Sequence, residues 1–143
     1  MAPSHVLVPM DGSPLSGDAL EHALETFDCR VTVLNVVTPL DEGMSESGLM
    51  EADEDRLAAA RERAEEVVND ARERAEAAGQ TVETTVETGE PAETVLEFVE
   101  DHNVDHVVMG GHGGERGRVA RRLLGTTATA VVGEAPVSVT VVR

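Results

Sequence analysis

The 143-residue sequence contains no lysine, no tryptophan and no tyrosine, and its only aromatic rings outside histidine belong to Phe27 and Phe98. The absence of lysine excludes a Walker A motif, a Schiff-base lysine and the lysine of a phospho-acceptor receiver domain. Two aromatic rings are too few to stack the bases of single-stranded nucleic acid. Several common activities are therefore excluded by composition alone.

Cysteine and long apolar runs are equally scarce. The single cysteine, Cys29, excludes an internal disulfide and a zinc site built from cysteines. The apolar runs have the length of strands, which is too short to cross a membrane. The first residues lack the basic and long apolar regions of a signal peptide, so we expect a cytoplasmic protein. No metal site is predicted, because four histidines lack metal-ligand spacing to carboxylates: His5, His22, His102 and His106.

Acidic residues number 28 against 11 basic residues, all of them arginine, and the formal net charge is −17. A charge of this size repels nucleic acid and anionic lipid, so we expect neither nucleic acid nor a membrane as a partner. The acidic residues are spread over the chain and do not form a tail. We interpret them as a hydrated surface adapted to high salt, and we expect a halophilic source.

The periodicity of apolar residues predicts strands that alternate with helices. The expected strands are His5–Pro9, Arg30–Val37, Thr81–Glu87, Val104–Gly110 and Pro136–Val142. The expected helices are Leu15–Phe27, Glu51–Ala78, Glu90–His102 and a last helix that ends near Val132. This alternation predicts one α/β domain over residues 1–143, with a five-stranded parallel open sheet and helices on both faces. The first and fourth strands are the most apolar and should be central, which gives the order 3-2-1-4-5.

In this order the strand sequence reverses between strands one and four. Open α/β sheets bind ligands at the carboxyl ends of the strands at such a switch point. The sequence has two unusual loops there, Pro9–Ser13 after the first strand and Met109–Gly114 after the fourth. Topology and loop chemistry therefore indicate the same place for a site.

The second loop has the composition of an anion-binding loop. Its glycines would let backbone N–H groups approach a phosphate, and a helix that starts near Gly117 would add its positive end. Four arginines lie within seven residues here: Arg116, Arg118, Arg121 and Arg122. Guanidinium groups bind phosphate well. The alternative is that these arginines form salt bridges with the acidic surface and that the glycines serve only a tight turn.

Taken together, these residues resemble the universal stress protein family over the whole chain, and they are similar to the branch that binds ATP. The likeness covers VLVPMDGSPLSGDAL (Val6–Leu20), VTVLNVV (Val31–Val37), the stretch Thr88–Gly113 and the stretch Leu123–Arg143. That branch carries a Gly-x2-Gly-x9-Gly-Ser/Thr pattern after strand four. Here eleven residues, not nine, separate Gly113 from Gly125, so two extra residues fall within Gly114–Arg122. The resemblance implies a Rossmann-like fold of the adenine nucleotide alpha hydrolase-like type, and together with the composition it suggests a halophilic archaeon as the source.

The resemblance also implies a binding site for ATP, with or without Mg²⁺. The residues implied to contact the nucleotide are Pro9, Asp11 and Val36 at the adenine, Met109 and Gly110 at the ribose and α-phosphate, and Gly113, Gly125, Thr126 and Thr127 at the phosphates.

Each of these assignments has an alternative that the residues leave open. Asp11 could be a turn or helix-cap residue, and Thr126 could serve only to cap a helix turn. Val36 and Met109 could be ordinary core residues. His112, which glycines flank, could be a phosphate contact or an exposed loop residue.

Hydrolysis would need a base and usually a carboxylate pair for Mg²⁺, and the only carboxylates in the two loops or next to them are Asp11 and Glu115. We therefore predict a regulatory protein that binds a nucleotide, with no catalytic residues assigned. The alternatives are a weak ATPase and a nucleotide-free, homodimeric stress protein. The last strand, Pro136–Val142, carries no charge and would lie at a sheet edge, so we expect a homodimer paired through it. The alternative is a monomer whose edge Arg143 covers.

Overall fold

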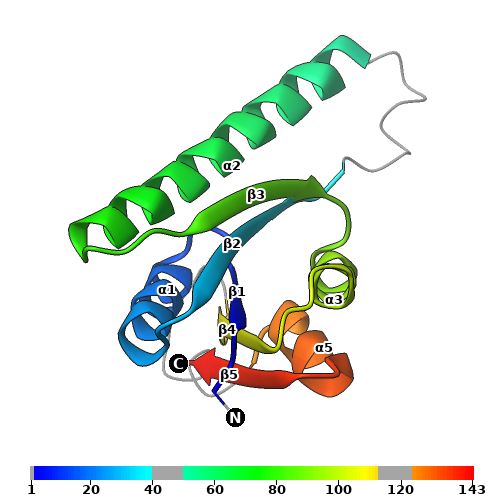
Figure 1. Ribbon diagram of the computed structural model, residues 1–143. Helices are drawn as coiled ribbons and strands as arrows, with labels where there is room; N and C mark the ends of the chain where they lie inside the picture. Colours follow the sequence, from blue (N-terminus) through cyan, green and yellow to red (C-terminus); the bar gives the residue numbers. More distant parts are fainter. Residues whose placement is uncertain (1, 40–49, 113–123) are drawn as a thin grey trace.

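The computed structural model describes residues 2–39, 50–112 and 124–143. Strands and helices alternate along these residues (Figure 1). The strands are β1 (His5–Pro9), β2 (Arg30–Val37), β3 (Glu83–Thr88), β4 (His106–Gly110) and β5 (Ser138–Val142). The helices are α1 (Pro14–Thr26), α2 (Met50–Ala77), α3 (Pro91–Asp101) and α5 (Thr126–Glu134). The expected helix start near Gly117 lies outside the described residues.

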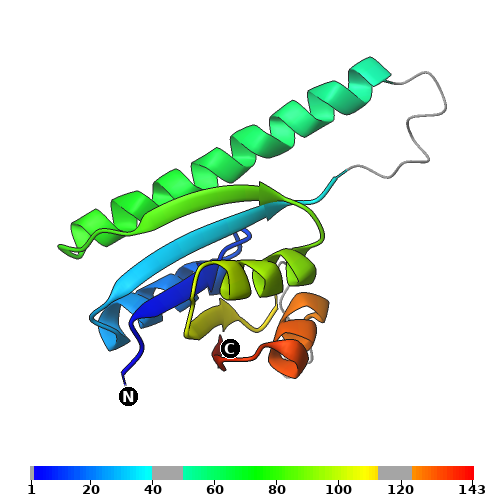
Figure 2. The ribbon, with the colours of Figure 1, turned by 45° about the vertical axis from the view of Figure 1, so that its right-hand side comes forward.

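The five strands form one sheet in the order β3-β2-β1-β4-β5, and every neighbouring pair is parallel. Helices cover both of its faces, with α1 on one face and α3 and α5 on the other (Figures 1 and 2). The sequence-based prediction of fold class and strand order is thus confirmed. The reversal of strand order between β1 and β4 is also where it was expected.

Two apolar cores hold these layers together. One core joins α1 and α2 to one face of the sheet, and the other joins α3 and α5 to the opposite face. The central strand β1 contributes to both, because Val6 and Val8 point to the first core and Leu7 to the second. All three side chains are completely buried, as expected of a central parallel strand.

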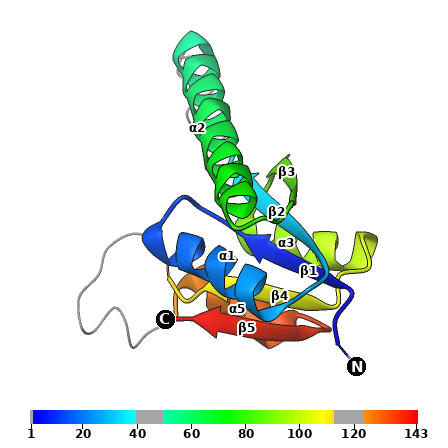
Figure 3. The same cartoon turned by 60° about the vertical axis from the view of Figure 1, so that its left-hand side comes forward.

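Helix α2 is the longest element, and its amino-terminal part extends well beyond the sheet (Figure 3). Small and β-branched residues of its carboxyl-terminal part pack on the first core. The helix ends in a turn at Gly79, whose φ of +76° favours glycine, and the N–H of Gln80 donates to the carbonyl of Ala75 over 2.8 Å. In the described part of the chain, no helix is long and apolar enough to span a membrane.

Candidate functional site

A cavity of about 310 Å³ lies at the carboxyl ends of β1 and β4, where the strand order reverses. Its wall combines the two loops that the sequence singled out with residues of β2, α3 and α5. The lining residues are Pro9, Met10, Asp11, Ser13, Ser16, Leu34, Val36, Thr38, Pro91, Val95, Met109, Gly110, His112, Gly125, Thr126, Thr127 and Ala128. The switch point predicted from the strand order therefore holds a cavity of ligand size.

The turn after β1 is anchored to β2 through both backbone groups of one residue. The N–H of Met10 donates to the carbonyl of Leu34 over 2.9 Å, and the side-chain amide of Asn35 donates to the carbonyl of Met10 over 2.8 Å. Asn35 is buried, with 7% of its surface exposed. Because a buried carbonyl needs a donor, this side chain fixes the backbone from which the next residue, Asp11, enters the cavity wall.

Asp11 acts within this turn. Its Oδ1 accepts a 2.9 Å hydrogen bond from the N–H of Ser13, and Ser13 in turn caps α1 by accepting from the N–H of Ser16. Gly12 makes the turn possible with a φ of +86°. The turn role that the sequence left open for Asp11 is therefore present, and its carboxylate also lines the cavity.

The end of β4 is tied to β5 and to the start of α5. The N–H of Gly111 donates to the carbonyl of Val142 over 2.8 Å, and the N–H of Gly125 donates to the carbonyl of Gly111 over 2.6 Å. A Cβ atom on Gly110 would lie 3.1–3.3 Å from atoms of Leu15, so the backbone at this point is close to α1. These contacts place the amino-terminus of α5 directly at the cavity.

That helix start is open toward the cavity. Gly125 is its N-cap residue, with an extended backbone and no side-chain hydrogen bond to the first turn. The following residues, Thr126 and Thr127, line the cavity. The first N–H groups of a helix lack partners inside the helix and carry partial positive charge, so this end of the cavity favours an anion.

In contrast to the polar start of α5, the wall made by β2 and α3 is apolar. Leu34, Val36, Pro91 and Val95 form an apolar surface there. Val36 is half-buried, and Met109 at the end of β4 is buried against the second core while it also lines the cavity. Met109 is therefore both a core residue and a residue of the cavity wall. This wall favours an apolar part of a ligand.

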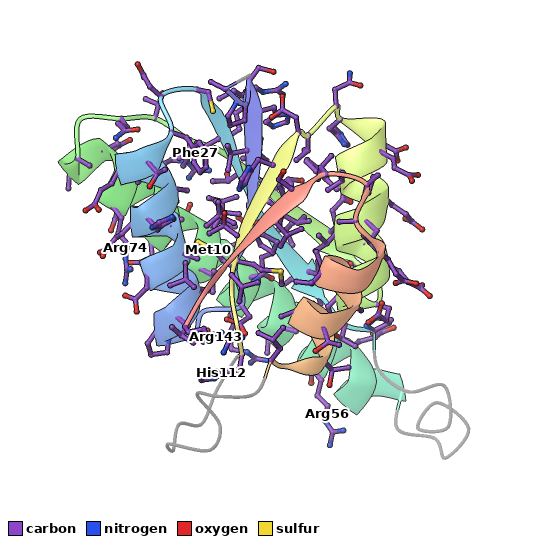
Figure 4. All side chains as sticks on the ribbon, turned by 90° about the horizontal axis from the view of Figure 1, so that it is seen from below. Met10, Phe27, Arg56, Arg74, His112 and Arg143 are labelled. Carbon is purple, nitrogen blue, oxygen red and sulfur yellow. The ribbon has the colours of Figure 1, made fainter. Side chains whose placement is uncertain are left out.

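His112 follows the glycine pair at the end of β4 and lines the cavity near the start of α5 (Figure 4). It is half-buried, so the alternative that His112 is an exposed loop residue is wrong. Both of its ring nitrogens are buried, and neither has a hydrogen-bond partner among the residues that the structure describes.

The structure brings together every described residue that the sequence assigned to the site. Pro9, Asp11, Val36, Met109, Gly110, Gly125, Thr126 and Thr127 all line the one cavity. Gly113 and the arginines of the 116–122 segment lie outside the described residues. The sequence reading missed Asn35, Pro91 and Val95. The available signal for Asn35 was an amide side chain between apolar neighbours in the strand Arg30–Val37, and no local signal existed for the two α3 residues.

A second, wider groove of about 760 Å³ lies between α2 and the turn after β1. Its α2 wall carries charges of both signs, with Arg56, Arg63 and Arg74 on the same wall as Glu66 and Asp70. Arg74 and Asp70 pair over 2.9 Å, as their spacing predicted. Among the described residues, no group of three histidine, cysteine or acidic side chains is arranged to hold a metal ion.

The sequence matches a known protein family over almost its whole length. A model of the universal stress protein family matches residues 3–143. A universal stress protein of Methanocaldococcus jannaschii is 32% identical over 96% of this chain and 81% of its own length.

Solved structures of that family share the fold. UspA of Lactobacillus plantarum superposes with a TM-score of 0.84, at 24% identity, over 100% of this chain and 99% of its own. A universal stress protein described as a complex with cAMP gives 0.71 at 22% identity, over 100% and 99% of the two chains. A family protein of Arabidopsis thaliana described with AMP bound gives 0.69 at 18% identity, over 98% and 91%.

Proposed function

Because this chain belongs to the universal stress protein family, we propose that it binds an adenine nucleotide in the cavity at the carboxyl ends of β1 and β4. We further propose that it acts as a stress-response regulatory protein that binds the nucleotide and does not turn it over. The observation that carries the proposal is the two-sided cavity wall. It is apolar at β2 and α3, and rich in open N–H groups at the start of α5.

A nucleotide fits this division of the wall. The adenine would lie against Val36 and Pro9 with Asp11 as a hydrogen-bond acceptor, and the ribose would lie near Met109 and Gly110. The phosphates would lie at Gly125, Thr126 and Thr127, with Gly113 as a further contact. Similar proteins described with cAMP and with AMP support an adenine nucleotide as the ligand class. ATP, with or without Mg²⁺, is the ligand that the glycine pattern favours.

Binding without turnover is supported by the acid–base groups of the wall. Asp11 is the one carboxylate among the described lining residues, and its Oδ1 already accepts the Ser13 N–H. Metal-assisted hydrolysis generally uses more than one such ligand together with a residue that positions water. A release assay for inorganic phosphate with ATP and Mg²⁺ tests this part. Sustained turnover that disappears in an Asp11→Asn variant would make the protein an ATPase.

The direct test of binding uses the absence of tryptophan and tyrosine. The protein itself absorbs almost nothing near 260–280 nm, so nucleotide carried through purification is visible in the supernatant of denatured protein. We expect an adenine spectrum and a mass that identifies the nucleotide. A supernatant without absorbance, together with no binding of added nucleotide, would favour the nucleotide-free reading.

We also propose a homodimer through β5. This strand is at the edge of the sheet and all its residues keep some exposure. None of them is charged, so nothing in the strand opposes pairing with a second copy. Light scattering in molar salt should give twice the chain mass of 15.1 kDa. A stable mass of one chain would support the monomer.

A further inference from the structure

We propose that the imidazole of His112 hydrogen-bonds the phosphate group of the bound nucleotide and so makes the site selective for phosphorylated adenosine. This inference rests on the proposed function, because it concerns the ligand of the same cavity. It assigns a role to a side chain that the glycine pattern does not include, and it starts from the hydrogen bonding of the histidines.

The other buried or half-buried histidines have partners. The ring nitrogens of His5 lie 3.0 Å from the carbonyl oxygen of His102 and 2.8 Å from Thr32 Oγ1. Nε2 of His106 lies 2.8 Å from Thr140 Oγ1. His112 differs, because both of its ring nitrogens are buried and neither has a partner in the described part of the chain. Burying such polar atoms unpaired is unfavourable, and a ligand that supplies a partner removes that cost.

The position of His112 decides which part of the ligand it would meet. Its backbone packs on Gly125, since a Cβ atom there would lie 3.3 Å from the Cα of His112. Gly125 is the N-cap of α5, and His112 lines the same cavity as Thr126 and Thr127 at the start of this helix, so the cavity offers both an imidazole and the first N–H groups of the helix. An acceptor with negative charge is stabilised by both, whereas the adenine ring fits the apolar wall of β2 and α3. The phosphate is therefore the group that belongs next to His112.

The chemistry of the imidazole agrees with this assignment. A neutral imidazole always carries one N–H, and phosphate oxygens accept hydrogen bonds without needing to donate. The carbonyl of Gly111, the residue before His112, already accepts from the N–H of Gly125 over 2.6 Å. A phosphate oxygen would give the His112 N–H an acceptor inside the cavity.

The test compares cAMP with adenosine by calorimetric titration. The phosphodiester of cAMP lacks the second ionisation that a phosphate monoester has near pH 6, so its charge stays constant over the titration conditions. For His112→Ala we expect cAMP to bind roughly tenfold to a hundredfold more weakly, the usual worth of a hydrogen bond to a charged group. The affinity of this variant for adenosine should change less than about twofold. His112→Asn and His112→Gln keep an N–H donor, and at least one should recover most of the loss.

His22→Gln is the matched control, because His22 is an exposed histidine of α1 that does not line the cavity. It should bind both ligands like the wild type. Equal weakening of cAMP and adenosine by His112→Ala, or unchanged cAMP affinity, would overturn the proposal. If the wild type binds neither of these ligands and neither ATP nor AMP, the proposed function itself fails; if it binds ATP or AMP but not cAMP, that nucleotide takes the place of cAMP in the comparison with adenosine. If it binds both and His112→Ala has no selective effect, only this inference fails.

A second readout is made on the wild-type protein, with His112→Gln used only to assign the signals. Ring nitrogens of the five histidines can be observed in the wild-type protein by proton–nitrogen correlation spectra. Addition of cAMP should shift the ring-nitrogen signals of one histidine, and these signals should be absent in His112→Gln. Adenosine should leave them in place. A shift of the same size with adenosine, or no shift with saturating cAMP, contradicts the contact with phosphate.

Discussion

The side-chain amide of Asn35 donates a 2.8 Å hydrogen bond to the carbonyl of Met10, and this bond joins the end of β1 to β2 beneath the cavity. The N–H of Met10 is held from the same strand by the carbonyl of Leu34. With both of its backbone groups paired to β2, Met10 cannot shift without breaking buried hydrogen bonds. The turn that begins there therefore presents Asp11 from a fixed backbone.

Replacing Asn35 with alanine should destabilise the protein by about 1–3 kcal/mol, because the buried carbonyl of Met10 loses its donor. Nucleotide affinity should fall as well, since the turn after β1 loses one of its anchors. Urea unfolding measures the first effect and titration the second. Asn69→Ala is the control, because the partner of Asn69 is the exposed Arg72 on the same helix and its loss should cost little. Equal stability of the two variants would contradict this account.

Gly125→Ala should weaken nucleotide binding while the fold is kept. The backbone of Gly125 is ordinary extended chain, so alanine brings no backbone strain, but its Cβ would press on His112 and occupy the open start of α5. Gly133→Ala in the same helix is the matched control, since no heavy atom lies within 4 Å of its new Cβ. That variant should gain roughly 0.5–1 kcal/mol from helix propensity. Retained affinity in Gly125→Ala would exclude this helix start from the site.

Acid should destabilise the protein through His106. Burial is the main cause of the lowered pKa of His106, Asp105 opposes the shift and His22 adds to it. The imidazole contacts Phe27, with ring centroids 4.8 Å apart. As the pH falls, the unfolded state takes up the His106 proton before the folded state does. The stability that neutral His106 contributes is therefore complete above the unfolded pKa of about 6.5 and is lost as pH falls through the lower folded pKa. In His106→Gln the stability should fall less over this range, and an unchanged profile would contradict the assignment.

Salt should stabilise the chain. A net charge of −17 makes the folded state repel itself, and screening reduces this repulsion as the Debye length falls to about 3 Å at 1 M salt. Thermal melting temperature should therefore rise between 0.1 M and 2 M potassium chloride. A melting temperature that stays level or falls over this range would argue against adaptation to high salt.

Two strands show what the sequence could and could not locate. β2 covers Arg30–Val37 as predicted, because a run of apolar, β-branched residues is a local pattern that indicates a strand. β4 begins at His106 and not at Val104, because the N–H of Val104 donates to the carbonyl of Val99 in the turn that ends α3. The carboxylate of Asp105 meanwhile accepts from the N–H groups of Ser4 and His5. These contacts depend on residues that are distant in sequence.

The start of β3 and part of the cavity wall also depend on contacts between segments that are distant in sequence. β3 begins at Glu83, two residues after the predicted start, where its pairing with Thr32 of β2 begins. Motif and topology together located the loops around the cavity. They did not locate Pro91 and Val95, which enter the wall only when α3 packs on the sheet, or Asn35, which supports the wall from β2 through its bond to Met10.

The most direct test of the central claim is calorimetric titration of nucleotide-free protein with ATP, AMP and cAMP in high-salt buffer. We expect saturable heat with one ligand per chain for at least one of these nucleotides, and clearly weaker binding in Gly125→Ala but not in Gly133→Ala. No heat with any of the three, from protein that also carried no nucleotide through purification, would contradict it.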